Sequence, residues 1–392
     1  MAKRSVTEAA VRGKRVLVRV DFNVPLRDGE VADDTRIRAA LPTIRDLLER
    51  GAAVVLATHL GRPKGKADPA LSVAPVARRL SELLGMEVAV ASSVVGSEVE
   101  AVAASLAPGE ILLLENTRFE PGEEANDPDF GAALARLGDL YVNDAFGAAH
   151  RAHASTVGIA EHLPAYAGLL LQREVEVLSR LLHDPERPFV AVLGGAKVSD
   201  KLAVIGHLLE RVDALLLGGG MANTVLLAQG HEVGASLAEP DRLDEARQHL
   251  ARADERRVPV LLPSDAVIAP SLESETSQSV PVERVPSDQA IFDIGPMTVD
   301  QFCARIASAR TVFWNGPMGV FERTPFATGT TEIACCVADA DAFTVVGGGD
   351  SLAAIEAAGV ADRIDHVSTG GGASLEFLEG RELPGIAVIP DA

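Results

Sequence analysis

Short apolar runs alternate with amphipathic helical stretches along nearly the whole chain, and this alternation limits the fold more than any other feature. Residues 53–57 (AVVLA) and 189–193 (FVAVL) are examples of the apolar runs. Aliphatic runs without polar alternation are typical of strands that are buried on both faces. Strands that alternate with helices favour βαβ units, whose strands are parallel. The sequence therefore predicts an α/β fold with mainly parallel sheets.

Polar side chains follow four of the predicted strands in the first half of the chain. These strands lie at residues 14–18, 53–57, 111–114 and 140–142. The polar residues that follow them are Asp21 and Asn23, then His59 and Arg62, then Arg118, and then Asn143, Asp144 and Arg151. Ligands of open α/β sheets bind just beyond the carboxyl ends of the strands, so we expect one polar pocket along one edge of one sheet.

Arginine is the most frequent cation among these residues, and Arg36 adds a further one. A guanidinium group binds carboxylate or phosphate through two parallel hydrogen bonds, which lysine cannot do. The cluster therefore indicates a small molecule that carries both groups. A purely structural alternative is that Arg19 pairs with Asp21 while Asn23 caps a turn.

The length of 392 residues exceeds the size at which a single hydrophobic core stops growing, so two domains are expected. Residues 168–183 have the pattern of one helix, since Leu171, Val175 and Leu178 fall on the same face. Asp184-Pro185 ends this helix. We interpret it as the connection between the two domains.

Glycine-rich loops follow three predicted strands in the second half, at residues 218–220, 347–349 and 370–372. Glycine lets backbone N–H groups approach a phosphate, and a helix N-terminus behind it favours the negative charge. None of the loops fits GxxxxGK[ST] or GxGxxG. A plain tight turn is the alternative for any one loop, but three together predict a nucleotide site.

The remaining composition excludes several classes of protein. The net charge of −20 argues against nucleic acid or an anionic membrane as a partner. No signal peptide and no apolar stretch long enough to cross a membrane is expected. Cys303, Cys335 and Cys336 lack metal-ligand spacing, so we expect buried free thiols and a reducing compartment.

The runs at residues 19–26, 59–63, 114–119 and 143–154 resemble those of phosphoglycerate kinases. The resemblance continues into the second half and covers essentially the whole chain. It implies two Rossmann-like doubly wound domains with mainly parallel sheets, joined by a helix and a C-terminal segment that returns to the first domain. The implied divisions are an acid-substrate domain at 1–167, the helix at 168–183, a nucleotide-binding domain at 184–372 and the returning segment at 373–392.

The resemblance also implies roles for the residues of the first half. Asp21 and Asn23 would hold the hydroxyl group of 3-phosphoglycerate and its neighbouring oxygens. Arg36 would lie nearest the reacting carboxylate and screen its charge. The residues implied for the phosphate and the other oxygens are His59, Arg62, Arg118 and Arg151. His150 and His153 would support the pocket, and for His153 alone a satisfied core histidine is the better interpretation.

In the second half the resemblance implies the nucleotide and metal contacts. Lys197 would stabilise the migrating phosphoryl group, and Lys201 would contact nucleotide phosphate from the same face of a helix start. Asp350 would reach Mg²⁺. The residues implied for the nucleotide are Lys201, Gly219, Asn315, Glu322, Gly348, Gly349, Asp350 and Ser351. Two positions depart from the family pattern, because Ser351 replaces a frequent Thr and Ile291 replaces a smaller residue.

The implied function is reversible, Mg²⁺-dependent phosphoryl transfer from 1,3-bisphosphoglycerate to ADP, which gives 3-phosphoglycerate and ATP in glycolysis. A nicotinamide-dependent dehydrogenase is disfavoured because GxGxxG is missing. A catalytically inactive nucleotide-binding regulatory protein is the other alternative, and turnover would separate the three. We also expect a cytoplasmic monomer whose domains close when both ligands are bound.

Overall fold

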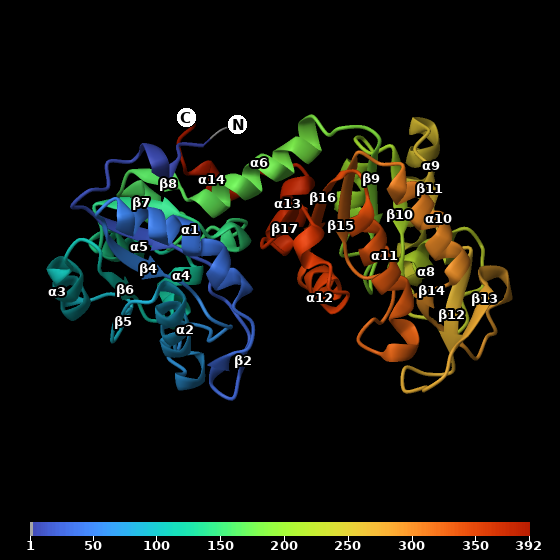
Figure 1. Ribbon diagram of the computed structural model, residues 1–392, viewed down its shortest axis with the longest axis horizontal. Coiled ribbons are helices and arrows are strands. Elements are labelled where there is room, and N and C mark those ends of the chain that lie inside the picture. Colours follow the sequence, from blue (N-terminus) through green and yellow to red (C-terminus); the bar gives the residue numbers. More distant parts are fainter. Residues whose placement is uncertain (1–2) are drawn as a thin grey trace. The chain divides into compact units, whose positions relative to one another are not determined.

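The computed structural model describes residues 3–392 and contains two compact units (Figure 1). Unit 1 consists of residues 3–176 together with Glu382–Ala392, and unit 2 consists of Val177–Arg381. The division therefore falls inside the helix at the junction, α6 (Leu169–His183), which is the helix predicted for residues 168–183. Residues 373–381 stay with unit 2, so the segment that returns to unit 1 is shorter than the predicted one.

Unit 1 is built on a six-stranded sheet in the order β5-β6-β4-β1-β7-β8, and all neighbouring strands are parallel. Its strands are β1 (Arg15–Arg19), β4 (Ala53–Ala57), β5 (Ala89–Val90), β6 (Ile111–Leu113), β7 (Leu140–Asn143) and β8 (Ala165–Ala167). A hairpin, β2 (Leu26–Arg27) and β3 (Glu30–Val31), lies outside this sheet. The four strands predicted in the first half are thus adjacent.

Helices cover both faces of this sheet, which explains the continuous apolar runs. They are α1 (Thr35–Glu49), α2 (Ala74–Leu84), α3 (Ser97–Ser105), α4 (Pro121–Glu124), α5 (Pro128–Ala135) and α14 (Pro384–Ala387), with the 3₁₀ turns η1 (Val6–Glu8), η2 (Pro69–Leu71), η3 (Thr117–Phe119), η4 (Phe146–Ala148) and η5 (Gly158–Glu161). Val54, Val55 and Leu56 of β4 are all fully buried, although successive side chains point to opposite faces. Ile37 and Ile44 of α1 pack into the same core, and full burial of such a side chain contributes roughly 1.5–3 kcal/mol.

Unit 2 contains a second six-stranded parallel sheet, in the order β11-β10-β9-β15-β16-β17. Unit 2 also contains a three-stranded antiparallel sheet in the order β13-β12-β14. Its strands lie between β11 and β15 in the sequence. The strands are β9 (Phe189–Leu193), β10 (Ala214–Leu217), β11 (Val260–Leu261), β12 (Asp265–Ala269), β13 (Gln278–Pro281), β14 (Ala290–Ile294), β15 (Thr311–Asn315), β16 (Phe343–Gly347) and β17 (His366–Ser368). The predicted α/β class with two mainly parallel sheets is confirmed.

The helices of unit 2 follow these strands in alternation. They are α7 (Leu202–Leu208), α8 (Gly219–Ala228), α9 (Leu243–Arg256), α10 (Pro296–Ala307), α11 (Thr328–Asp339), α12 (Gly349–Ala357) and α13 (Gly372–Leu378), with the 3₁₀ turns η6 (Pro240–Arg242), η7 (Val282–Arg284), η8 (Thr324–Phe326) and η9 (Ala361–Arg363). Trp314 is fully buried in the core formed by the sheet with α10, α11 and α12. Within residues 3–392, no helix is both long enough and apolar enough to cross a membrane.

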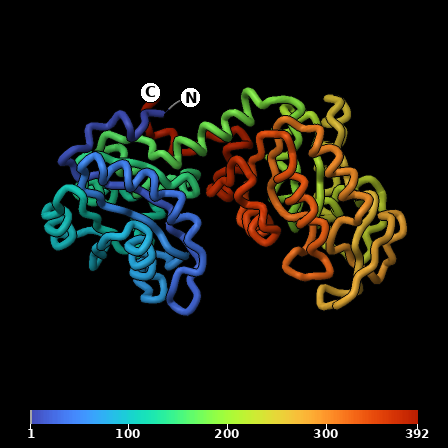
Figure 2. Tube along the Cα trace, viewed as in Figure 1, coloured from blue at the N-terminus to red at the C-terminus, as the bar shows by residue number. Residues whose placement is uncertain are grey.

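The end of the chain packs beside its beginning in unit 1, as the traces in Figure 2 show. The N–H of Arg4 donates to the carbonyl of Pro390 at 2.9 Å, and the Lys3 ammonium lies 2.9 Å from the Asp391 carboxylate. Further inside, the N–H of Gly385 donates to the carbonyl of Ala149 at 2.8 Å. These contacts attach the returning segment to residues 3 and 4 and to the loop that follows β7.

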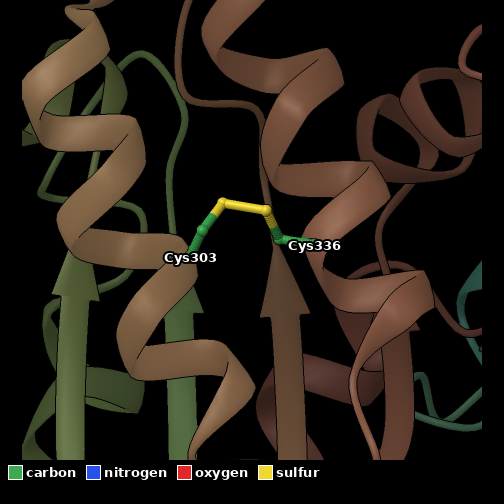
Figure 3. The surroundings of a disulfide bond; sticks show 2 residues. All are labelled: Cys303 and Cys336. Atoms are coloured by element: carbon green, nitrogen blue, oxygen red, sulfur yellow. A yellow bond between two sulfur atoms is a disulfide. The ribbon is translucent and has the colours of Figure 1, made fainter.

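The cysteines differ from the prediction. Cys303 of α10 and Cys336 of α11 form a disulfide, with their Cα atoms 5.5 Å apart (Figure 3). Only Cys335 is free, and it is half-buried. The expectation of three free thiols is therefore wrong, and with it the argument from free thiols to a reducing compartment. The sequence could not reveal the pair, because the two cysteines are 33 residues apart and meet only when α10 packs against α11.

We predict that the unfolded protein shows one reactive thiol per chain before reduction and three after reduction. The single thiol is Cys335, and the other two belong to the disulfide. Closing a loop of this length restricts the unfolded chain, so reduction should lower the free energy of unfolding of unit 2 by about 2–4 kcal/mol. Thiol titration in denaturant measures the first quantity, and denaturant unfolding followed by the fluorescence of Trp314, the one tryptophan, measures the second.

The variant Cys303→Ser is the matched control for this titration. It should show two thiols without reduction, because Cys336 loses its partner. Three thiols in the untreated wild-type protein would contradict the disulfide.

Candidate active site

The polar residues predicted from the strand ends of unit 1 come together at one edge of its sheet. β1 lies between β4 and β7, and the chain moves to one side of β1 first and to the other side later. The carboxyl ends of β1 and β7 therefore flank the point at which the strand order reverses. Open α/β sheets bind their ligands at such a point.

Asp21 and Arg36 form an ion pair at this edge. Nη1 of Arg36 lies 3.0 Å from Oδ2 of Asp21 and donates to the carbonyl of Asn23 at 3.3 Å. The Asp21 side chain is 10% exposed and the Arg36 side chain 34% exposed. The pair thus keeps a polar face toward solvent while α1 fixes the position of the arginine.

Asn23 connects the loop after β1 to the loop after β4. Its Oδ1 accepts a hydrogen bond from the N–H of Gly61 at 2.9 Å, and the carbonyl of Gly61 accepts one from Nη1 of Arg118 at 2.8 Å. Gly61 has φ of +62°, a conformation that glycine adopts without strain. Asn23 and Arg118 therefore hold the two peptide groups that flank the Cα atom of Gly61, and the simple turn cap of the structural alternative is not what Asn23 does.

Asn116 is a site-organising residue that the sequence prediction missed. Its Oδ1 accepts the N–H groups of Leu60 and Arg118 at 3.2 and 3.1 Å. Its Nδ2 donates to the carbonyls of Leu60 and Leu71 at 2.7 and 2.9 Å. One fully buried amide thus connects the backbone of the loop after β4 with that of the loop after β6. Its position two residues before the predicted Arg118 was the available signal.

The arginines predicted for the pocket differ in their freedom. Arg118 is buried, and its Nε lies 3.2 Å from the carboxylate of Glu124. Nε of Arg151 donates to Nε2 of His150 at 3.1 Å. Arg62, by contrast, is exposed. Two of the cations are therefore held in place by neighbours, and Arg62 is the one that a ligand could order.

His59 and His153 are both buried, and burial is the largest cause that lowers the pKa of each ring. The pKa of His59 falls well below its ordinary value, and that of His153 falls to about 4, because nearby arginines oppose a further positive charge. Nδ1 of His59 lies 3.0 Å from Nη2 of Arg19. The imidazole rings are therefore neutral at neutral pH.

The polar residues directly after β7 are structural. Asn143 is fully buried, and its Nδ2 donates to the carbonyl of Gly385 at 2.9 Å. Oδ1 of Asp144 accepts the N–H groups of Leu170 and Leu171 at 2.9 and 3.2 Å, which caps the start of α6. Burial raises the pKa of Asp144 to about 6. These two side chains support the pocket and do not face a ligand.

In unit 2 the glycine loops at the ends of β9, β10 and β15 pack backbone against backbone. The N–H of Gly195 donates to the carbonyl of Pro317, and that of Gly219 to the carbonyl of Met318, both at 2.9 Å. A Cβ atom added at Gly194 would lie 2.0 Å from the carbonyl oxygen of Pro317. Close approach of the loops, together with any phosphate contact, explains why glycine occupies these turns.

The two lysines of this region precede the helix and do not lie in it. α7 begins only at Leu202, so the prediction that Lys197 and Lys201 share a face of a helix start is wrong. Lys197 is exposed. Lys201 is 8% exposed, and its Nζ donates to the carbonyls of Gly194 and Asn315 at 2.6 and 2.8 Å. Burial lowers the pKa of Lys201 to about 8, although Asp350 and Asp200 raise it.

Asn315 and Ser351 connect further loops in the same region. Nδ2 of Asn315 donates to the carbonyl of Gly347 at 2.7 Å, and Oγ of Ser351 accepts the N–H of Gly316 at 2.6 Å. Both side chains are buried. Gly348, which precedes α12, has φ of +95°. Asn315 and Ser351 therefore set the shape of these glycine loops through the backbone.

A cavity of about 370 Å³ opens beside these loops, within the size range of small-molecule sites. Its wall is mostly apolar, with contributions from Leu226, Ile291 and Met318, and it also contains the carboxylates of Glu322 and Asp350. Of the residues predicted for the nucleotide, those that line the cavity are Gly219, Glu322 and Asp350; those that do not are Lys201, Asn315, Gly348, Gly349 and Ser351. An apolar cavity with few polar groups suits a nucleobase and ribose.

The residues at Asp350 fit a magnesium ion bound together with a nucleotide. Within residues 3–392, no three His, Cys, Asp or Glu side chains come together as ligands of a metal ion. Asp350 is exposed, lies in the first turn of α12 and borders the cavity. Mg²⁺ commonly uses one or two protein carboxylates and takes its other ligands from phosphate oxygens and water.

The chain matches the family model of phosphoglycerate kinase over residues 6–381. It is 60% identical over 393 residues to a phosphoglycerate kinase of Desulforudis audaxviator, with 99% of each chain covered. It is 57% identical over 399 residues to one of Chloroflexus aurantiacus, with all of each chain covered. The structure of phosphoglycerate kinase from Coxiella burnetii is similar with a TM-score of 0.88, 43% identity and 98% of each chain covered.

Asp293 is a buried carboxylate in the wall of the cavity, and its pKa allows a test of how burial affects a charge at this site. It is 1% exposed and accepts the N–H groups of Gly329 and Ile294 at 2.6 and 2.9 Å. Burial raises its pKa to about 7. This pKa lies above that of an aspartate in the unfolded chain. The contribution of Asp293 to the free energy of unfolding is therefore fully present below about pH 4 and is lost as the pH rises through 7.

In the wild type, the free energy of unfolding should fall by an amount on the order of 4 kcal/mol between pH 4 and 8. We predict that Asp293→Asn does not show this fall. Urea unfolding at several pH values, followed by the fluorescence of Trp314 in the same unit, measures it. The control Asp288→Asn changes an exposed carboxylate of unit 2 and should keep the wild-type pH dependence. Parallel curves for Asp293→Asn and the wild type would contradict the assignment.

Proposed function

The chain belongs to the phosphoglycerate kinase family, and from this premise we propose how its residues divide the reaction between them. The activity is phosphoryl transfer between 1,3-bisphosphoglycerate and ADP, which gives 3-phosphoglycerate and ATP. In our proposal the acid binds at the strand ends of unit 1 and the nucleotide at the glycine loops of unit 2. The observation that carries it is the arginine cluster around Asp21 and Asn23 at the strand-order reversal of unit 1.

The acid substrate meets two kinds of groups in unit 1. Asp21 and Asn23 accept or donate hydrogen bonds at its hydroxyl group, and Arg36 lies nearest the carboxylate that gains or loses the phosphoryl group. The residues that bind the distal phosphate and the other oxygens are His59, Arg62, Arg118 and Arg151. The ion pair between Arg36 and Asp21 supports this division, because it keeps the cation directed at the pocket before the ligand arrives.

In unit 2 the nucleobase and ribose occupy the cavity, with Glu322 accepting from the ribose hydroxyls. The phosphates lie toward the start of α12, where Gly348, Gly349 and Ser351 provide a helix N-terminus and a glycine turn. Asp350 would hold Mg²⁺, which supplies neutralising charge to the phosphate oxygens when it is bound with the nucleotide. Gly219, Asn315 and Lys201 keep the loops in register, and Lys201 adds a fixed positive charge.

The transfer itself needs no covalent enzyme intermediate, since positioning and charge neutralisation can carry it. Lys197 is exposed and can therefore reach the migrating group, while Arg36 screens the carboxylate on the other side. Each ligand site is formed by one chain, which supports a monomer as the working form. We place the enzyme in the cytoplasm because its substrates are the intermediates of glycolysis.

We predict that Arg36→Ala and Lys197→Ala lower kcat by roughly a hundred- to thousandfold, while Arg62→Ala mainly raises KM for 3-phosphoglycerate. The first two residues meet charge that migrates, and the third meets charge that is present throughout. A coupled assay of ATP formation with Mg²⁺ measures both constants, and chelation of Mg²⁺ should stop turnover.

Arg45→Ala is the matched control, because this exposed arginine of α1 donates only to the carbonyl of Leu83 at 3.0 Å among its hydrogen bonds. Its kinetic constants should equal those of the wild type. If Lys197→Ala kept kcat and changed only KM, the role assigned to Lys197 would be wrong.

We also predict that the radius of gyration falls when 3-phosphoglycerate and Mg-nucleotide are both bound, and little with either alone. The acid site and the nucleotide site lie on different units, and direct transfer needs the reacting atoms about 3–3.5 Å apart. Each ligand alone contacts one unit and so gives little preference for a closed state. Small-angle scattering with binding confirmed decides this, and an unchanged radius in the ternary mixture would refute ligand-driven closure.

A further inference from the structure

Arg19, the last residue of β1, has an unusual set of partners for a buried cation. Its side chain is 1% exposed. Nε donates to Oγ of Ser155 at 2.7 Å, Nη1 donates to the carbonyl of Val20, and Nη2 lies 3.0 Å from Nδ1 of His59. It forms no ion pair with Asp21, whose carboxylate pairs with Arg36. The guanidinium thus directs one of its N–H groups at a ring that the proposed function places at the substrate.

The chemistry of the two groups decides which form of the ring fits this contact. A guanidinium has five N–H donors, no acceptor, and keeps its proton in proteins. The contact is therefore a hydrogen bond only if Nδ1 of His59 offers a lone pair. A neutral imidazole with a free lone pair on Nδ1 carries its proton on Nε2. The opposite tautomer or the imidazolium ion would place one N–H group against another.

A buried network holds Arg19 in this position. Oγ of Ser155 accepts from Arg19 and donates to Oε1 of Glu123, and the N–H of Ser155 donates to Oε2 at 2.9 Å. Glu123 is fully buried and also accepts from Oγ1 of Thr117 at 3.3 Å. The carboxylate thus balances the charge of Arg19 through one hydroxyl group. A linked network of this kind resists rearrangement more than separate hydrogen bonds would.

The charges around His59 act in the same direction. The ring is 6% exposed. Burial lowers its pKa most, and the positive charges of Arg19 from β1, Arg118 from η3, Arg151 from the loop after β7 and Arg36 from α1 lower it further. A second cation at this position would therefore be unfavourable. The pocket receives its positive charge from arginines and receives a neutral donor from His59.

We propose that Arg19 is a positioning residue that holds His59 as the neutral Nε2–H tautomer, so that the ring donates a hydrogen bond to an oxygen of the acid substrate. This rests on the proposed function only for the identity of the acceptor. The tautomer itself follows from the contact between Arg19 and His59. The consequence is a substrate contact whose strength does not change as the pH passes through the usual range of histidine.

The tautomer can be measured directly in the wild-type protein. The chain contains nine histidines, and selective ¹⁵N labelling with the spectrum of His59→Gln as a reference identifies the ring nitrogens of His59. At pH 7 and without ligand, the expected result is an unprotonated Nδ1 and a protonated Nε2. A protonated Nδ1, or a ring with both nitrogens protonated, overturns the proposal whatever the kinetic measurements show.

The positioning role is tested by Arg19→Lys, with Arg15→Lys as its matched control. Arg15 begins the same strand and lies 3.0 Å from Asp139, away from the pocket. The ammonium group of lysine cannot serve Ser155, Val20 and His59 together, so His59 should lose its fixed tautomer in the ¹⁵N spectrum. At pH 8 the KM for 3-phosphoglycerate should then rise roughly three- to tenfold, the effect of one weakened hydrogen bond.

The ¹⁵N spectrum separates this role from a general structural one. Burial and the charges of Arg118, Arg151 and Arg36 remain in Arg19→Lys, so the ring should stay neutral and the ratio of the variant KM to the wild-type KM should change little between pH 8 and 5.5. The titration of the substrate cancels in this ratio. A raised KM in folded Arg19→Lys with the tautomer kept, or an unchanged KM after the tautomer is lost, overturns the positioning role.

Ser155→Ala provides a second variant if Arg19→Lys does not fold, since it keeps the guanidinium and removes only the partner of Nε. A smaller change of the same kind in the ¹⁵N spectrum supports the proposal, and an unaltered spectrum with an altered KM overturns it. Absence of 3-phosphoglycerate turnover in the wild type would refute the proposed function and leave the measured tautomer to decide the inference.

Discussion

Parallel pairing of β1 with both β4 and β7 is the constraint on which the proposed acid site depends. In a parallel sheet the carboxyl ends of all strands lie at the same edge. Strand pairing alone therefore brings residues that are far apart in the sequence to that edge. The same arrangement in unit 2 brings the ends of β9 and β15 together, and the glycine loops follow from it. The two ligand sites that we propose therefore depend on sheet topology first and on side-chain chemistry second.

Buried positive charge is managed differently in the two units. In unit 1 the charge of Arg19 is balanced by Glu123 through a serine hydroxyl, whereas in unit 2 Lys201 is held by two backbone carbonyls without a carboxylate at hydrogen-bond distance among its described partners. Burying an ion is unfavourable unless its donors are satisfied. Each arrangement keeps a cation in the site before the anionic ligand is present, so the charge needs no reorganisation when the ligand binds.

The sequence predicted what depends on local pattern and on single strand ends. The strands, the helix at the domain junction and the cluster of Asp21, His59 and Arg118 all follow from short segments. The sequence did not predict the roles of Asn116, Glu123 and Ser155, because these roles depend on hydrogen bonds that only packing creates. The bond between Ser155 and Arg19, 136 positions earlier, is an example. The disulfide between α10 and α11 was not predicted for the same reason, since the spacing of cysteines along the chain does not show which helices pack together. The start of α7 was misplaced because the glycine loop continues for several residues after β9.

The returning segment has a consequence for the order of synthesis. Unit 2 is one continuous stretch of sequence, whereas unit 1 includes Glu382–Ala392, which a ribosome produces after all of unit 2. Asn143, beside the acid pocket, donates to the carbonyl of Gly385 in that segment. A nascent chain can therefore assemble unit 2, for which we propose the nucleotide site, while the proposed acid site of unit 1 still lacks a support. Synthesis of residues 382–392, and not completion of either sheet, is the event that supplies this support.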